Sequence, residues 1–117
     1  MNIIIDTEDI RIELSKLEKL LSLHDSFKIQ ISQIIGIYNT LLPYTWKEIR
    51  APGTEIPGLI KAGTFYTFRG TEFWMLRKKD NPVRIELKNN KFKRLIVGID
   101  NYERWVFVIE NLKERII

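Results

Sequence analysis

Alternation of apolar and polar residues runs through much of the chain and predicts β-strands. Four segments carry an apolar residue at every second position, which is the pattern of a strand with one buried face: 10–14, 27–31, 83–87 and 95–99. Three more apolar segments contain aromatic and β-branched residues that favour strands over helices: 34–38, 59–68 and 73–76. A short strand at 3–5 is a candidate partner for the strand at 10–14.

Turn-forming residues separate these segments and predict hairpins. The stretches 69–71, 80–82 and 89–90 contain Gly, Asn, Asp or Pro, which suit the backbone geometry of tight turns. We therefore expect the four strands within 59–99 to run as an antiparallel meander. Seven or so short strands with this spacing are typical of a barrel or a sandwich.

Two segments predict helices. Near residues 15–24, Ser15 and Glu18 have the spacing of a capping box, and one apolar stripe follows, formed by Leu17, Leu20 and Leu21. Near residues 101–115, Asp100 is the expected cap, and apolar residues recur behind it with helical spacing: Trp105, Val108, Ile109, Leu112 and Ile116. We expect this C-terminal helix to cover one open end of the strand layer.

Length and composition fit one globular domain spanning residues 1–117. The chain is 44% apolar and 29% charged, which is the balance of a folded protein rather than of a disordered one. Its apolar runs are shorter than the roughly 20 residues that span a bilayer, and we recognise no secretory signal. We expect a cytoplasmic protein without integral membrane association.

Charge is distributed unevenly along the chain. Residues 1–59 carry six Lys or Arg and eight Asp or Glu, a net charge of −2, whereas residues 60–117 carry thirteen and seven, a net charge of +6. Most of this excess lies between Arg69 and Arg94. Such a field can attract nucleic acid or another anionic partner, although lysine-rich strands also serve solubility and protect sheet edges.

Aromatic residues are interleaved with basic ones in 65–69 and 73–79. On an open sheet face, such residues can stack on unpaired bases while Lys and Arg hold the phosphates. On a strand, however, half of the aromatic side chains must point into the core. We expect Phe73 and Met75 on one face and Trp74 and Leu76 on the other, with the second face covered by a helix, a loop or another subunit.

Few residues offer catalytic or metal-binding chemistry. The chain has no cysteine, which excludes disulfides, thiolate metal sites and cysteine nucleophiles. His24 is the only histidine, and a histidine at a helix end is more typical of carbonyl capping or of interaction with the helix dipole. Asp6, Glu8 and Asp9 form an acidic turn without the glycine of a calcium loop. We expect no enzyme activity, no cofactor and no metal.

The segment 46–58 predicts an ordered, sharply turning loop, because its part 50–58, Arg-Ala-Pro-Gly-Thr-Glu-Ile-Pro-Gly, contains two prolines and two glycines. Residues 50–58, together with 17–20, 62–65 and 95–100, resemble uncharacterised small prokaryotic proteins with a pleckstrin-homology (PH)-like domain. The similarity covers nearly the whole chain, and Arg-Ala-Pro-Gly-Thr at 50–54 is its most specific part.

The resemblance implies a mainly β, α+β fold, with a seven-stranded antiparallel barrel or sandwich and a C-terminal capping helix. It also implies a non-catalytic binding or assembly module, but no particular ligand. One departure is the helix near 15–24, which stands where the eukaryotic phosphoinositide binders place a basic loop.

Three hypotheses for function follow. The first is a PH-like module that acts through protein–protein contacts, including self-association through the apolar face around 73–76. The second is an OB-like or basic-patch binder of nucleic acid or another anionic ligand, with the candidate residues Arg69, Arg77, Lys78, Lys79, Lys91, Lys93 and Arg94. The third is an enzyme with a carboxylate or arginine site near Arg50 and Thr54, which predicts a concave pocket there.

Overall fold

Two β-sheets and two α-helices make up the computed structural model, which describes residues 1–40, 49–56 and 59–116, with the backbone alone described at 49–52 and 115–116. The small sheet has the order β1-β2-β3 and consists of β1 (Asn2–Ile5), β2 (Asp9–Glu13) and β3 (Phe27–Gln30). The large sheet has the order β4-β8-β9-β7-β6-β5 and consists of β4 (Ile34–Tyr38), β5 (Ile49–Ile56), β6 (Ile60–Thr67), β7 (Gly70–Arg77), β8 (Pro82–Leu87) and β9 (Arg94–Gly98). The helices are α1 (Lys16–Ser22), α2 (Tyr102–Ile116) and the short 3₁₀ helix η1 (Ile31–Gln33).

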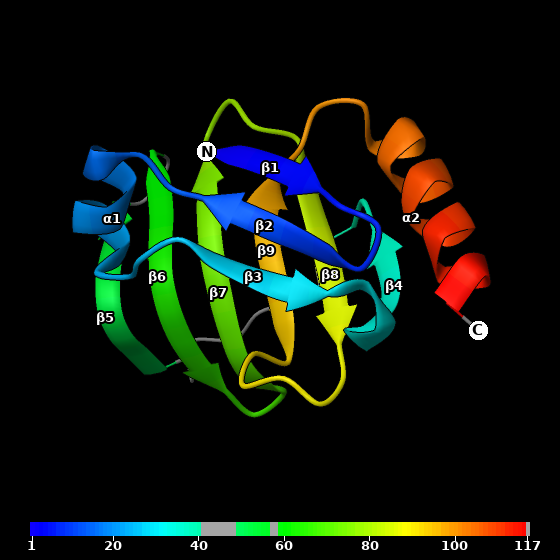
Figure 1. Cartoon of the computed structure of the whole chain (residues 1–117). Coiled ribbons are helices and arrows are strands. Elements are labelled where there is room, and N and C mark those ends of the chain that lie inside the picture. The colour runs from blue at the N-terminus through cyan, green and yellow to red at the C-terminus, as the bar shows by residue number, and fades with distance from the viewer. Residues whose placement is uncertain (41–48, 57–58, 117) are drawn as a thin grey trace.

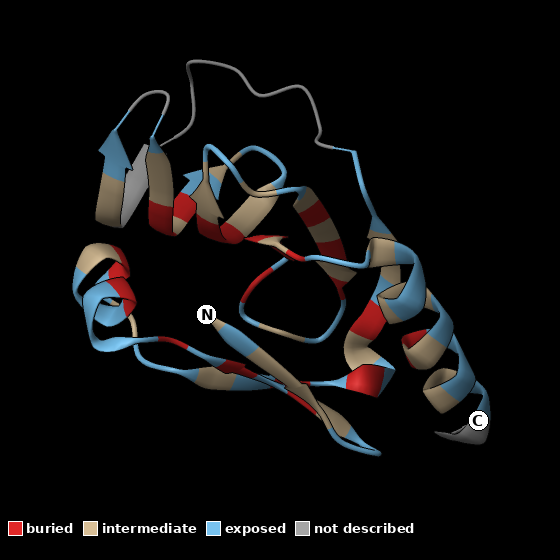
Figure 2. Cartoon of the chain, turned by 90° about the horizontal axis from the view of Figure 1, so that it is seen from above, coloured by how far each residue is buried: buried red, intermediate tan, exposed pale blue. Residues whose placement is uncertain are grey.

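The two sheets lie face to face, and the strands of the small sheet run across those of the large one (Figure 1). The inward-facing residues of the predicted alternating segments form the core between them, namely Ile10, Ile12, Ile29, Val83, Ile85, Leu95 and Val97. Seen from above, α1 and α2 lie at opposite ends of this sandwich (Figure 2). Alternation therefore identified β2, β3, β8 and β9 correctly, together with the buried face of β2, β3 and β8. The strand β9 is instead buried on both faces, because Arg94 and Ile96 are buried opposite Leu95 and Val97.

The predicted meander is wrong at the connection between β7 and β8. These strands are not neighbours, because β9 lies between them, parallel to β7 and antiparallel to β8. The turn after β7 crosses the end of β9 (Figure 1), where the Arg77 N–H donates to Asp80 Oδ2 at 2.9 Å and the Ile99 N–H donates to the Asn81 carbonyl at 3.1 Å. A turn motif in the sequence predicts that the chain reverses direction, but it does not predict that the two strands it joins pair with each other.

The crossing requires a glycine at position 98. A Cβ atom placed there would lie 2.5 Å from Asp80 Cβ and 2.6 Å from its Cγ. We expect Gly98→Ala to lower the free energy of unfolding by about 1–3 kcal/mol, because the turn must be displaced. Urea denaturation of Gly98→Ala, Asp80→Gly and the double variant tests this; if contact with Asp80 is the cause, the double variant loses less stability than the two single changes added together.

Of the two expected seven-stranded architectures, a barrel or a sandwich, the described residues form two packed sheets rather than a closed barrel. Their nine strands divide into two sheets, and no strand among them pairs with both. The coarser prediction is confirmed, since the fold is mainly β with a short helix after the second strand and a terminal helix.

Within the segment predicted to be a loop, residues 49–56 instead form the edge strand β5. The pairing register with β6 shifts between Arg50 and Gly53, and a bulge of this kind on an edge strand tolerates the Pro52 nitrogen, which has no proton to donate. Gly53 has φ +156°, and a Cβ atom there would lie 2.3 Å from the Ala62 carbonyl oxygen. Residues 46–48 and 57–58 of the predicted loop lie outside the described residues.

The C-terminal helix α2 packs where the sequence places it. Trp105 and Leu112 are half-buried against the main core, and Ile109 is buried. The helix also supplies donors to the edge strand β4, since the Tyr102 hydroxyl donates to the Ile37 carbonyl at 3.0 Å and the Lys113 ammonium donates to the Ile34 carbonyl. Covering a sheet edge in this way protects it from pairing with other chains.

Candidate binding surface around the first helix

The helix α1 presents leucines to solvent rather than to the core. Leu17, Leu20 and the C-cap residue Leu23 are 58%, 68% and 62% exposed. Figure 2 shows the outward side of α1 as exposed and its inward side as buried. The sequence predicted one buried stripe containing Leu17, Leu20 and Leu21; Leu21 alone of these three packs against the core.

Polar contacts of Glu18 explain this orientation. Glu18 is 1% exposed, and its carboxylate accepts the Ser15 N–H at 2.8 Å while the Ser15 hydroxyl accepts the Glu18 N–H at 3.1 Å. The same carboxylate lies 3.3 Å from the Arg77 guanidinium and 2.9 Å from the Met1 ammonium. A carboxylate with these partners must point toward the body of the protein. In so short a helix, this orientation turns Leu17 and Leu20 toward solvent.

A contact with β5 holds the other end of the helix. The Thr54 hydroxyl donates to the Leu21 carbonyl at 2.8 Å, and the Ser22 hydroxyl donates to the Glu18 carbonyl at 2.7 Å. Because carbonyls in the last turn of a helix have no partner within it, Thr54 satisfies one of them. Thr54 thus makes a structural contact here, whereas the side chain of Arg50, which was predicted with it, lies outside the described residues.

The Glu18 carboxylate predicts a loss of stability in acid. Burial acts to raise its pKa, but hydrogen bonds from the Ser15 N–H and the Met1 ammonium outweigh burial, so the pKa of Glu18 lies below its usual value of 4.5. A lowered pKa in the folded state contributes stability that is present above the usual value and is lost as the pH falls through the folded pKa. We expect Glu18→Gln to be less stable by about 1 kcal/mol near neutral pH, with the difference shrinking below pH 4.5.

Denaturation at pH 7, 5, 4 and 3 measures this difference, and Glu13→Gln, on the exposed face of β2, is the matched control. A difference between Glu18→Gln and the unmodified protein that stays constant across this range would contradict the assignment.

A surface hollow of about 400 Å³ adjoins the C-terminal end of α1. Its lining residues come from the α1 C-cap, β6, β7 and the loop between β8 and β9, and are Leu23, His24, Thr64, Tyr66, Thr71, Lys91 and Phe92. Leu23 belongs both to the exposed leucines and to this lining. We call the three leucines and the hollow together the α1 surface.

His24 is packed among aromatic rings, a position that the expectation of carbonyl capping or of interaction with the helix dipole did not include. Its ring centroid lies 5.1, 5.3 and 5.6 Å from those of Phe27, Phe73 and Phe92. Its Nδ1 lies 2.6 Å from the Asp25 carbonyl oxygen. Because a carbonyl accepts but cannot donate, Nδ1 carries a proton in this contact.

The basic residues predicted as one patch are divided between the two ends of β7. Arg69 and Lys93 lie at its beginning, where the Lys93 side chain packs across Gly70 and the Lys93 N–H donates to the Thr71 carbonyl at 2.7 Å. Lys78 and Lys79 follow its last residue. The eight residues of β7 separate the groups by about 25 Å. Of the other predicted residues, Arg77 is paired with Glu18, and Lys91 joins the first group at the hollow.

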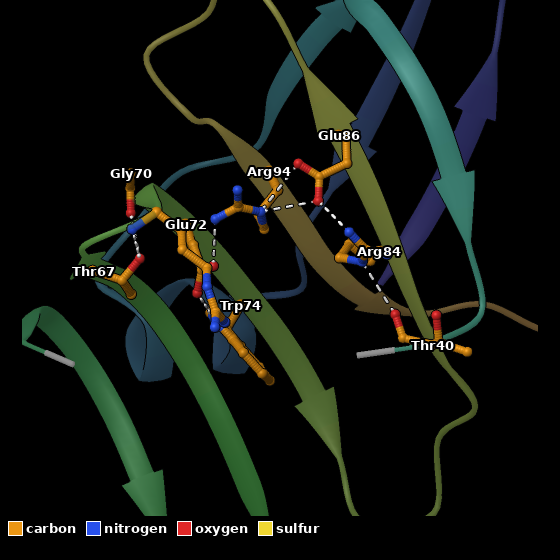
Figure 3. A network of polar contacts seen from close by, with 9 residues as sticks. Thr40, Thr67, Gly70, Glu72, Trp74, Arg84, Glu86 and Arg94 are labelled. Atoms are coloured by element: carbon orange, nitrogen blue, oxygen red, sulfur yellow. Dashed lines mark hydrogen bonds and ion pairs between the residues drawn. The ribbon is translucent and has the colours of Figure 1, made fainter. Parts of the chain in front are cut away.

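Arg94 is not a surface residue, because it lies at the centre of a buried ion network (Figure 3). It is 5% exposed, and its guanidinium contacts the Glu72 carboxylate at 2.7 Å and the Glu86 carboxylate at 3.0 Å. Glu72 also accepts the Trp74 indole N–H at 3.0 Å, and Arg84 contacts Glu86 at 2.6 Å. Burial acts to lower the pKa of Arg94, but the hydrogen bonds to the two carboxylates outweigh it and raise the pKa.

The face of the large sheet that carries Trp74 is buried within a single chain. Trp74 is 4% exposed, and Phe65 and Ile96, which pack against it, are fully buried. Trp74 and Leu76 do lie on the face opposite Phe73 and Met75, as predicted. Because this face is already covered, it no longer supplies a reason to expect self-association.

Comparisons with protein families, with curated proteins and with solved structures found no match to this chain. In the described part of the chain, no helix is long and apolar enough to cross a membrane, and no three His, Cys, Asp or Glu side chains gather as a metal site would require.

Sequence reasoning missed Leu17, Leu20, Leu23 and Tyr66 as surface residues. Helical spacing of leucines is normally the mark of a buried stripe. The capping box was the one signal in the sequence for this orientation. The side chain of Glu18 must point back toward the Ser15 backbone, so it fixes which side of the helix faces the preceding segment of the chain. Nothing local, however, shows that Arg77 pairs with the same carboxylate.

Proposed function

We propose that this protein is a non-catalytic binding module whose α1 surface docks a segment of another protein that carries apolar and acidic side chains. The observation behind this proposal is the row of three exposed leucines held in place by the buried polar contacts of Glu18. Grouped apolar side chains that the fold keeps in solvent are typical of an interaction site.

The charges around the leucines indicate the chemistry of the occupant. The exposed charged residues of α1 are Lys16 and Lys19, since Glu18 is buried and paired. Lys91 lines the adjoining hollow, and Asp25 is the exposed carboxylate beside it. A partner with acidic residues flanking its apolar anchors complements this surface.

The same charges argue against a second copy as the occupant. A two-fold contact places the same patch of both subunits together, so Lys16 and Lys19 of one copy would face those of the other. A membrane surface would suit lysines beside leucines, but a hollow that accepts an anchoring side chain is a feature of protein recognition.

The PH-like resemblance belongs to this proposal as well. It is supported by a mainly β body followed by a terminal helix whose Trp105 and Leu112 pack against the core. The parallel pairing of β7 with β9 is a departure from the expected all-antiparallel sheet.

Site-specific photo-crosslinking tests the docking proposal. A photoreactive residue replaces Leu20 in one variant and Ile35 in another; Ile35 is 52% exposed on β4, away from α1. We expect a protein adduct from position 20 that position 35 does not form. The adduct is identified by mass spectrometry, and the purified partner is then titrated against the unmodified chain.

Leu20→Gln is expected to weaken that binding about five- to tenfold, because partial burial of one leucine is lost, while Ile35→Gln leaves it unchanged. Glutamine is chosen because its helix propensity is close to that of leucine. Adducts with lipid alone, with a second copy of the chain, or equally from both positions would overturn the proposal.

A second candidate is the binding of a nucleic acid or another anionic ligand at the beginning of β7. What favours it is that this end of the strand carries Arg69 and the aromatic Phe68, which is 82% exposed, while Lys93 packs across Gly70 and Lys91 lines the hollow with Thr71. Fluorescence anisotropy of labelled single-stranded DNA at low and high salt tests it. We expect Lys93→Gln to weaken binding and Lys79→Gln, at the other end of β7, to leave it unchanged; no binding at low salt would exclude this candidate.

A further inference from the structure

The hollow beside α1 has an aromatic floor. His24 and Phe92 line it directly, and Phe27 and Phe73 stand behind them with ring centroids 5.0 Å apart. Phe73 is fully buried and Phe92 is 2% exposed. Packed rings of this kind form a rigid, apolar wall, and about 400 Å³ is at the small end of the range for ligand pockets.

The rim of the hollow is polar and carries one positive charge. Hydroxyl groups come from Thr64 and Tyr66 on β6 and from Thr71 on β7, where Tyr66 and Thr71 are register partners. The cation is Lys91, whose ammonium lies 5.1 Å from the centroid of the Phe92 ring. Among the described residues that line the hollow, none is a carboxylate. Asp25, which follows His24 in the sequence, turns its backbone carbonyl to the His24 ring.

Hydrogen-bonding capacity complements this charge. His24 Nδ1 donates its proton to the Asp25 carbonyl, so this proton is not available to a ligand. The hydroxyl groups of the rim can donate or accept. The hollow thus combines a flat apolar wall with hydrogen-bond donors and a cation that suit an anion.

From this arrangement we infer that the hollow takes a carboxylate joined to an apolar group, supplied by the partner segment that docks on α1. The inference rests on the proposed function and names the anchoring group. Two sources share this chemistry: the C-terminal residue of a chain, or an internal Asp or Glu beside an apolar residue. In both, the apolar group lies against Phe92 and His24 while the carboxylate meets Lys91.

Small probes test the chemistry on the full chain without the partner. We expect 3-phenylpropionate to shift the NMR signals of His24, Tyr66 and Phe92 saturably, and to bind more tightly than the uncharged 3-phenylpropanamide. Lys91→Gln is expected to weaken 3-phenylpropionate binding about two- to fivefold, the range for an exposed ion pair, with no effect on the amide. Lys79→Gln, an equal charge change elsewhere, should alter neither affinity.

Three short peptides then distinguish the sources: one ending in Phe with a free carboxylate, the same peptide amidated, and an amidated peptide with an internal Phe-Glu pair. Binding by the first alone indicates a chain end, and binding by the third indicates an acidic side chain. Equal affinities for the probe acid and its amide, or no shift with any probe, would overturn the inference. In that event, loss of partner binding in Leu20→Gln would still support docking on α1, so the two proposals fail separately.

Discussion

Replacing Arg94 with alanine is expected to lower the free energy of unfolding by about 3–5 kcal/mol. The guanidinium lies between two carboxylates on neighbouring strands, because Glu72 of β7 and Glu86 of β8 are both register partners of Arg94 on β9. Glu72 is fully buried. In Arg94→Ala the Glu72 carboxylate remains buried but loses the attraction of the Arg94 guanidinium, which offsets its desolvation. Removing one partner of a buried ion pair therefore destabilises the fold by more than the intact pair stabilises it.

Urea denaturation measures the effect of Arg94→Ala, with Arg11→Ala as the matched control. Arg11 is 47% exposed and lies 3.7 Å from Asp6, so its removal should change stability by less than about 1 kcal/mol. The double variant Glu72→Gln/Arg94→Met removes both charges and should recover part of the loss. A loss below about 1 kcal/mol in Arg94→Ala would mean that Glu72 does not depend on this cation.

Replacing Phe73 with alanine is expected to cost about 3–5 kcal/mol as well, by a different mechanism. Phe73 is fully buried and contacts the rings of His24, Phe27 and Phe92, with centroids 5.3, 5.0 and 5.7 Å away. The variant leaves a cavity and also loses edge-to-face contacts that contribute beyond buried area. Since small domains are stable by about 5–15 kcal/mol, this change removes a large part of the total.

Thermal and urea denaturation of Phe73→Ala measure the loss, and Phe107→Ala is the control with the same chemical change. Phe107 is 68% exposed on α2, so its replacement should have an effect near zero. Because Phe73 stands behind the hollow, the His24 and Phe92 signals should also shift in the NMR spectrum of the variant. Similar losses from the two variants would show that the aromatic cluster does not carry the stability assigned to it.

The candidate site could be predicted from the sequence only in part. Lys91 was among the expected ligand-binding residues and does line the hollow, whereas Arg94 was expected in the same patch and is buried. The two residues are three positions apart, and no local pattern separates a lysine in a loop from an arginine that meets Glu72 and Glu86 across two strands. The aromatic packing of His24 could not be predicted, because its neighbours at 27, 73 and 92 come together only through the fold.

The sequence by itself determined where most of the strands and the terminal helix lie and, for β2, β3 and β8, which side each strand buries. That information is local: a period of two or of 3.6 residues sets which side chains share a face, whatever the element packs against. Only the tertiary structure decided that β9 lies between β7 and β8, that Arg94 is buried, and that Leu17 and Leu20 remain in solvent. These features depend on residues distant in sequence: Arg94 pairs with Glu72, and Glu18 pairs with Arg77. A local sequence pattern cannot predict a contact between residues that only the fold brings together.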